Sequence, residues 1–163
     1  MKRAEELTRE IHESPAGPEV GAFFDLDQTL LAGFSAFSFF RERITSGRIS
    51  PREMSDSLRG ALSFALGRTG FSGMMAATTA AYRGMAESVL RETGQEVFEK
   101  HLARQIYPEA RALVAAHRAR GHTLAIVSSA TCYQAAPVAE ALGIPHVLCT
   151  QLEVEHYANF ITP

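Results

Sequence analysis

Two aspartates follow an apolar run near the start of the chain, and their type and spacing indicate phosphate-ester chemistry. Asp25 and Asp27 come directly after residues 20–24, which read as a buried strand. Alternate residues of an extended segment point the same way, so both carboxylates can reach one ligand. A carboxylate can attack phosphorus and form an aspartyl phosphate. The second carboxyl group can then protonate the leaving oxygen and later deprotonate the attacking water.

This chemistry predicts a magnesium ion, because the attacking carboxylate and the phosphate are both anions. Mg²⁺ typically binds one or two carboxylates together with substrate phosphate. The alternative is that Asp25 and Asp27 only cap or solvate the end of a strand, since Asp-x-Asp alone is a weak motif. The apolar run before the aspartates and the pair Thr29-Leu30 after them favour the functional interpretation.

A second group of polar residues follows another apolar run. Residues 123–127 are followed by Ser128 and Ser129, just before a predicted helix. Short hydroxyls and free backbone amides at a helix N-terminus form an anion site. The alternative is plain capping of that helix by Ser129 or Thr131. Ligands of parallel sheets gather at the carboxyl ends of the strands, so we expect Ser128 to face Asp25 across a gap that fits a phosphoryl group.

The order of elements predicts an α/β fold with a parallel sheet and flanking helices. Strands are predicted at 20–24, 123–127 and 146–149. Helices are predicted at 2–13 before the first strand, at 109–120 before the second and at 133–142 before the third, and a small hairpin is predicted within 152–161. Residues 34–106 show no strand pattern and read as an inserted helical module. Its helices are predicted from about 34, from Pro51, over 72–82 and 86–90, and from Thr93 to about 104.

Composition excludes several other classes of protein. The 163 residues are 46% hydrophobic and 21% charged with a net charge of −2, which is typical of a globular domain. No basic stripe indicates nucleic-acid binding, and no apolar run is long enough to span a bilayer. Cys132 and Cys149 are too few for a disulfide framework and lack metal-ligand spacing, so we expect a reducing, cytoplasmic location.

The segment from Phe24 to Leu30 resembles the first motif, D-x-D-x-T, of the haloacid dehalogenase (HAD) superfamily. The apolar strand that ends in Ser128 resembles the second motif. The helical insert directly after the first motif is similar to the lid of subfamily IB, the phosphoserine-phosphatase-like branch. The resemblance covers nearly the whole chain and implies a Rossmann-like, three-layer core with a C1-type helical cap. The implied domains are an N-terminal helix and linker at 1–19, an incomplete core at 20–33 and 107–163, and a cap at 34–106.

The resemblance also implies roles for individual residues. Asp25 would be the nucleophile and Asp27 the general acid and base. Mg²⁺ would bind the Asp25 side chain and the backbone carbonyl of Asp27. Ser128, assisted by an amide near Ser129, would hold the phosphoryl group, and Thr29 would support the loop. The implied function is Mg²⁺-dependent hydrolysis of a small phosphomonoester.

Two departures from the family pattern limit this expectation. The family has a third-motif lysine and an acidic fourth motif beyond the second motif, whereas no lysine follows Ser128 here and the acids there match no such motif. We therefore expect a truncated chain with weak magnesium binding, little turnover and an unpaired apolar strand edge at residues 21–24 that invites homo-oligomerisation. Phosphoserine phosphatases also place a glutamate nine residues after the nucleophile, where this chain has Phe34. Phosphoserine is thus a doubtful substrate.

Two alternatives to a phosphatase stay open. The chain could be a non-catalytic module that keeps the phosphate pocket without turnover. It could also be the N-terminal domain of a fusion with a lysophospholipid acyltransferase, because some similar IB hydrolases carry that domain.

Overall fold

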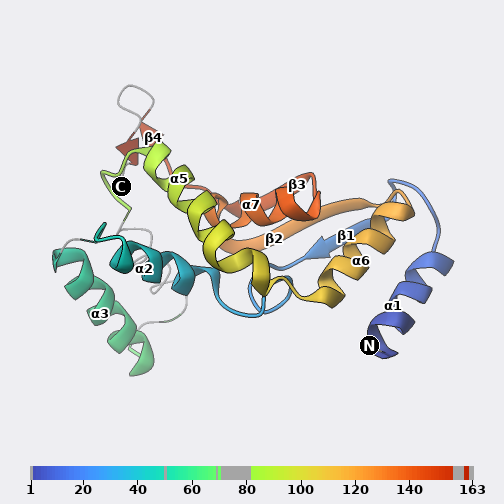
Figure 1. Ribbon diagram of the computed structural model, residues 1–163, viewed down its shortest axis with the longest axis horizontal. Coiled ribbons are helices and arrows are strands. Elements are labelled where there is room, and N and C mark those ends of the chain that lie inside the picture. The colour runs from blue at the N-terminus through green and yellow to red at the C-terminus, as the bar shows by residue number, and fades with distance from the viewer. Residues whose placement is uncertain (1, 50, 69, 71–81, 156–159, 162–163) are drawn as a thin grey trace. The chain divides into compact units, whose positions relative to one another are not determined.

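The computed structural model describes residues 2–49, 51–68, 70, 82–155 and 160–161 (Figure 1). The apolar runs predicted as strands form strands, and the amphipathic segments between them form helices. In chain order the elements are α1 (Lys2–Glu13), β1 (Gly21–Phe24), α2 (Ser35–Thr45), α3 (Pro51–Ala65), α5 (Glu87–Val97), a π-helical turn (Phe98–Leu102), a 3-10 turn (Ala103–Gln105), α6 (Pro108–Ala119), β2 (Thr123–Thr131), α7 (Cys132–Leu142), β3 (His146–Thr150), β4 (Val154–Glu155) and β5 (Phe160–Ile161).

The chain divides into two compact units. The first comprises residues 1–39 and 93–151, and the second comprises residues 40–92 and 152–163. The first unit contains the three-stranded sheet and all the residues singled out for chemistry. The second contains α3 and the antiparallel pair β4–β5, in which Val154 pairs with Ile161. Among the described residues, no helix is both long and apolar enough to cross a membrane.

The sheet of the first unit is parallel, with strand order β1-β2-β3 (Figure 1). Phe24 pairs with Ile126, and Ile126 pairs with Val147 on the other side. Each strand is followed by a helical crossover before the next one, as parallel pairing requires. The α/β class and the parallel topology predicted from the sequence are confirmed.

One face of this sheet is buried and the other is largely exposed. Ala22, Leu124 and Ile126 lie in the hydrophobic core with residues of α6 and α7, and Phe24 and Val147 pack against them. Side chains alternate between the faces along a strand. On the opposite face Phe23, Val127 and Leu148 are 71%, 45% and 56% exposed. The three strands are therefore apolar on both faces, although only one face is covered by described residues.

Most helices lie where the periodicity predicts them, and one prediction was wrong. The two helices expected at 86–90 and from Thr93 form the single helix α5, which continues into the π-helical turn. Residues 93–96, Thr-Gly-Gln-Glu, were interpreted as the start of a new helix. The glycine is instead required by packing, as described next. The helix predicted over 72–82 lies outside the described residues except for its last position.

Gly94 allows α5 to contact the first turn of α7, and replacing it by alanine is expected to destabilise the fold. A Cβ added at Gly94 would lie 2.3 Å from the Tyr133 carbonyl oxygen, so backbone would have to move. Overpacking of this kind costs about 1–3 kcal/mol, more than the roughly 1 kcal/mol that alanine gains in a helix. Urea unfolding measures the difference. Gly70→Ala is the control, because an added Cβ there meets nothing within 4 Å, and equal stability of both variants would contradict the prediction.

Two histidines join the start of β2 to the segment before β1. His117 Nδ1 and His122 Nδ1 are 2.8 Å apart, and His122 Nε2 lies 2.8 Å from the Pro15 carbonyl oxygen. A carbonyl only accepts, so His122 Nε2 carries the proton and its Nδ1 is the acceptor in the neutral ring. Burial, followed by the charge of His122, lowers the pKa of His117.

This pair is expected to make the protein less stable in mild acid. A histidine whose pKa is lowered by folding binds more protons in the unfolded state, so stability falls as pH drops below the ordinary histidine pKa of about 6.5. We expect the urea midpoint to fall between pH 7.5 and pH 5.5. The His117→Gln variant should lose less over the same range, and an identical decrease in both proteins would refute this explanation.

Candidate functional site

The sequence-predicted site residues lie at one edge of the sheet. Asp25 directly follows Phe24, the last residue of β1, and Ser128 comes two residues after Ile126, the register partner of Phe24 in β2. Both residues therefore come just after the register pair Phe24–Ile126, at the carboxyl ends of two adjacent parallel strands. Clefts at this edge are the usual ligand sites of parallel α/β sheets.

The loop after β1 is held by one buried residue. Leu26 is fully buried, and its carbonyl oxygen accepts hydrogen bonds from the backbone amides of Leu30 and Leu31, each at 3.0 Å. The amide of Gln28 donates to the Gly33 carbonyl at 3.2 Å. Gln28 has φ of +60° and, among the described residues, is the only non-glycine residue with positive φ. Such strain gathers at functional loops.

The two aspartates differ in what surrounds them. Asp25 is exposed, and among the described residues nothing hydrogen-bonds its carboxylate. Asp27 is half-buried, and Ser35 binds both of its oxygens. The Ser35 amide donates to Oδ1 at 2.8 Å and the Ser35 hydroxyl donates to Oδ2 at 3.2 Å. One carboxylate is thus free to bind or attack, and the other is fixed in place.

Burial raises the pKa of Asp27 above the ordinary carboxyl range. The two hydrogen bonds from Ser35 act in the opposite direction, and the nearby charge of Asp25 raises the pKa further. A raised pKa favours the protonated form, which a general acid requires.

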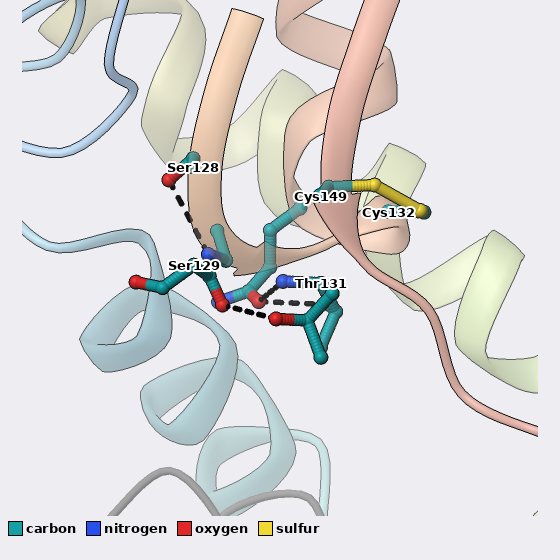
Figure 2. Close-up of a disulfide and its surroundings, with 8 residues drawn as sticks. Ser128, Ser129, Thr131, Cys132 and Cys149 are labelled. Carbon is teal, nitrogen blue, oxygen red and sulfur yellow. Dashed lines mark hydrogen bonds between the residues drawn. A yellow bond between two sulfur atoms is a disulfide. The ribbon is translucent and has the colours of Figure 1, made fainter. Parts of the chain in front are cut away.

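The second polar group differs in detail from the prediction (Figure 2). Residues 128 and 129 were expected after the strand, but β2 extends to Thr131 with an irregularity after Val127. Ser128 is half-buried, and its Oγ accepts a hydrogen bond from the Ala130 amide at 3.3 Å, which leaves its hydroxyl proton free to donate. The side chain of Ser129 is exposed, while its carbonyl oxygen accepts from Thr150 Oγ1 at 2.8 Å.

The capping alternative is correct for Thr131. Thr131 is the N-cap of α7 and forms a capping box with Gln134. Thr29 is exposed, and within the described part of the chain no hydrogen bond joins its side chain to another residue. Its predicted support of the loop stays a prediction.

A disulfide links the first residue of α7 to β3, and the sequence analysis missed it. Cys132 and Cys149 are bonded, with Cα atoms 5.5 Å apart (Figure 2). Thr131 pairs with Thr150, which brings the neighbouring cysteines together. The signal was the position of each cysteine beside the ends of two predicted adjacent strands.

A cavity of about 430 Å³ opens beside Ser128. Its other lining residues belong to β3 or follow it, and they are Val147, Leu148, Cys149, Thr150 and Gln151. Neither aspartate lines it. The cavity therefore lies on the β3 side of Ser128, away from β1.

The donor set suits a hard cation. Among the described residues, no three His, Cys, Asp or Glu side chains converge to form a complete metal site. Mg²⁺ needs only one or two carboxylates when substrate phosphate supplies further oxygens. The free Asp25 carboxylate and its repulsion with Asp27 fit such an ion, because a cation would relieve that repulsion.

Ligands of parallel α/β sheets bind at the carboxyl edge, and the acidic and hydroxyl side chains at this edge suit a phosphate ester. Residues 22–162 match the family model of the haloacid dehalogenase-like hydrolases. The chain therefore belongs to this family, and the resemblance seen in the sequence is confirmed.

Two curated relatives match most of the chain. A probable phosphatase of Mycobacterium tuberculosis is 28% identical over 82% of this chain and 48% of its own length. An "inhibition of morphological differentiation protein" of Streptomyces azureus is 28% identical over 90% of this chain and 57% of its own length. The chain thus spans about half the length of the curated relatives it matches.

Solved structures show the same fold. A Bordetella pertussis protein of unknown function aligns with a TM-score of 0.74 at 21% identity, over 91% of this chain and 67% of that one. A phosphoserine phosphatase described as a phospho-aspartyl intermediate analogue aligns with a TM-score of 0.55 at 16% identity, over 88% of this chain and 60% of that one.

Proposed function

We propose that the protein is a Mg²⁺-dependent phosphomonoester hydrolase that works through an aspartyl phosphate on Asp25. One observation carries the proposal. Asp25, with its exposed carboxylate that no described residue hydrogen-bonds, and Ser128 both follow the register pair Phe24–Ile126 at the carboxyl ends of two parallel strands. The carboxyl group of Asp27, held by Ser35, belongs to the same loop as Asp25. The relatives named as phosphatases support the same reaction class.

The reaction has two steps in this proposal. An oxygen of Asp25 attacks phosphorus, the bond to the ester oxygen breaks, and Asp27 gives its proton to that oxygen as the alcohol leaves. Asp27, now a carboxylate, takes a proton from water, which attacks the same phosphorus and releases phosphate and free Asp25. The Ser128 hydroxyl donates to a phosphoryl oxygen in both steps.

The Asp25 side chain and the backbone carbonyl of Asp27 would hold Mg²⁺. When bound, the ion screens the negative charges of the carboxylate and the phosphate from each other. Ser128 and the amide near Ser129 provide the uncharged donors for the phosphoryl oxygens. Thr29 supports the loop that carries both aspartates.

The substrate is proposed to be a small phosphate ester whose alcohol is less polar than serine. Phe34 occupies the ninth position after Asp25, and its ring contacts that of Phe37 with centroids 6.2 Å apart. Both rings are exposed, at 47% and 72%. Phe34 has no carboxylate to pair with a substrate ammonium group, so an aromatic or aliphatic alcohol fits better. The cytoplasm is the proposed location.

Two measurements test the proposed function. Fluoroberyllate binds a carboxylate as a mimic of the phosphoryl group, so ¹⁹F NMR should detect it on the protein only when Mg²⁺ is present. Hydrolysis of p-nitrophenyl phosphate should depend on Mg²⁺ and exceed that of phosphoserine. Binding of fluoroberyllate without turnover would establish the non-catalytic alternative. Absence of both would overturn the proposal.

We further propose that the protein self-associates through β1. Among the described residues β1 has a strand partner on one side only, and Phe23 is 71% exposed beside that free edge. Free apolar edges invite pairing with another chain, and charged side chains oppose it. Light scattering should show a mass that rises with concentration, and Phe23→Lys should reduce it. A monomer at all concentrations would contradict this prediction.

A further inference from the structure

Asp27 is connected to the N-terminus of α7 by a chain of buried hydrogen bonds. Ser35 Oγ, which donates to Asp27 Oδ2, also lies 3.2 Å from Gln134 Nε2. Gln134 Oε1 in turn lies 2.7 Å from the Thr131 amide and 2.8 Å from Thr131 Oγ1. Ser35, Gln134 and Thr131 are all buried, at 0%, 4% and 2% exposed. Water therefore cannot replace these partners easily.

The Thr131 backbone amide determines the donor and the acceptor of every hydrogen bond in this series. A backbone amide can only donate, so the atom of Gln134 that faces Thr131 is the amide oxygen. The Gln134 NH₂ group must then face Ser35 and donate to it. Because Ser35 Oγ accepts that bond, its own hydrogen is directed at Asp27. The arrangement thus fixes the Ser35 hydroxyl as a donor to the carboxylate.

The same bonds leave Asp27 able to react. An ionised carboxylate has about four lone-pair positions, and Ser35 occupies one on each oxygen. The remaining positions are open for a proton. Rotation of the carboxyl group, in contrast, would break both bonds to Ser35. These hydrogen bonds therefore hold the orientation of the Asp27 carboxyl group and leave it able to give or take a proton.

We propose that Ser35 and Gln134 are positioning residues for Asp27, and that Gln134 acts on Asp27 only through the Ser35 hydroxyl. This inference rests on the proposed function for its catalytic meaning. It also links the two parts of the site, because Gln134 belongs to α7, which starts three residues after Ser129. A purely structural role for Gln134 would be capping of α7 through Thr131.

The Gln134→Glu variant separates these two roles. Glutamate keeps an oxygen that accepts from the Thr131 amide and hydroxyl, so the cap is retained. It removes the NH₂ donor, and the Ser35 hydroxyl is then expected to turn toward the new carboxylate and away from Asp27. Gln95→Glu is the matched control, since Gln95 is exposed on α5 and bonds only Glu99 among the described residues.

NMR of the 163-residue protein tests the chain of bonds without relying on turnover. Gln134→Glu should shift the Asp27 carboxyl ¹³C signal and the Ser35 amide proton, although Gln134 touches neither group. Ser35→Ala should shift the same Asp27 signal, and adding Gln134→Glu to it should change that signal no further. Gln95→Glu should leave both signals in place. An unchanged Asp27 signal in a folded Gln134→Glu variant would overturn the proposal. If Gln134→Glu does not fold, an unchanged Asp27 signal in Ser35→Ala would overturn it instead.

Turnover gives a second, independent readout. If the protein hydrolyses p-nitrophenyl phosphate, Ser35→Ala and Gln134→Glu should each lower kcat about tenfold and leave KM nearly unchanged. This is a part of the 10²–10⁴-fold that an acid–base group contributes. The double variant should be no slower than Ser35→Ala alone, whereas independent effects would multiply to about a hundredfold. Absence of hydrolysis in the unmodified protein would count against the proposed function only, because the NMR signals decide the positioning.

Discussion

Replacing Asp25 by asparagine is expected to abolish both Mg²⁺-dependent hydrolysis and fluoroberyllate binding. Asparagine is nearly the same size but has no anionic oxygen to attack phosphorus or to bind the cation. Asp25 is exposed and, within the described residues, has no hydrogen-bond partner, so the fold should be unaffected. The measurements are p-nitrophenyl phosphate turnover and ¹⁹F NMR, with the thermal unfolding midpoint as the check on folding.

Asp27→Asn provides the contrast that assigns the two roles. It should slow turnover by about 10²–10⁴-fold, the usual contribution of an acid–base group, while fluoroberyllate still binds Asp25. Asp56→Asn, an exposed change on α3, is the matched control and should retain full activity. If Asp25→Asn still bound fluoroberyllate, another group would have to be the nucleophile.

Loss of the disulfide is expected to produce the largest change in stability. Cys132 and Cys149 are 17 residues apart, and closing a loop of this length restricts the unfolded chain by about 3 kcal/mol. Replacing both cysteines by serine, or adding reductant, should therefore lower the free energy of unfolding by about that amount. Urea unfolding with and without dithiothreitol measures it.

The serine variant also serves as the control, because reductant should leave its stability unchanged. Equal stability of the oxidised and reduced protein would contradict the prediction. Disulfides are rare in a reducing cytoplasm. In that proposed location, the reduced and less stable form would be the relevant one.

The placement of the candidate site could be predicted because it depends on local patterns. Apolar runs predicted β1 and β2 as strands, and parallel pairing then placed Asp25 and Ser128 at one edge. The predicted burial of both strands holds for one face only, because Phe23 and Val127 are exposed on the other. The bonds that hold Asp27 could not be predicted in this way. Ser35 is eight residues away in sequence and Gln134 over a hundred, and neither has a motif of its own.

The errors in the fold share one physical cause, which is that tertiary contacts override local preference. A helix start was predicted at Thr93, yet α5 continues through this position, and the close approach of Tyr133 requires glycine at position 94 inside the helix. β2 continues past the irregularity after Val127 because Thr131 pairs with Thr150 of β3, and the sequence pattern does not show this pairing. The disulfide likewise follows from the register of β2 and β3.

The backbone conformation of Gln28 has a consequence for how the chain can change over evolution. With φ of +60°, position 28 is nearly closed to valine, isoleucine and threonine, whereas glycine and asparagine reach this conformation at little cost. Exposure alone would class the position as freely variable. The positive φ instead excludes most L-residues with a branched Cβ. Position 28, in the loop after β1, can therefore accept fewer residue types than its exposure to solvent suggests.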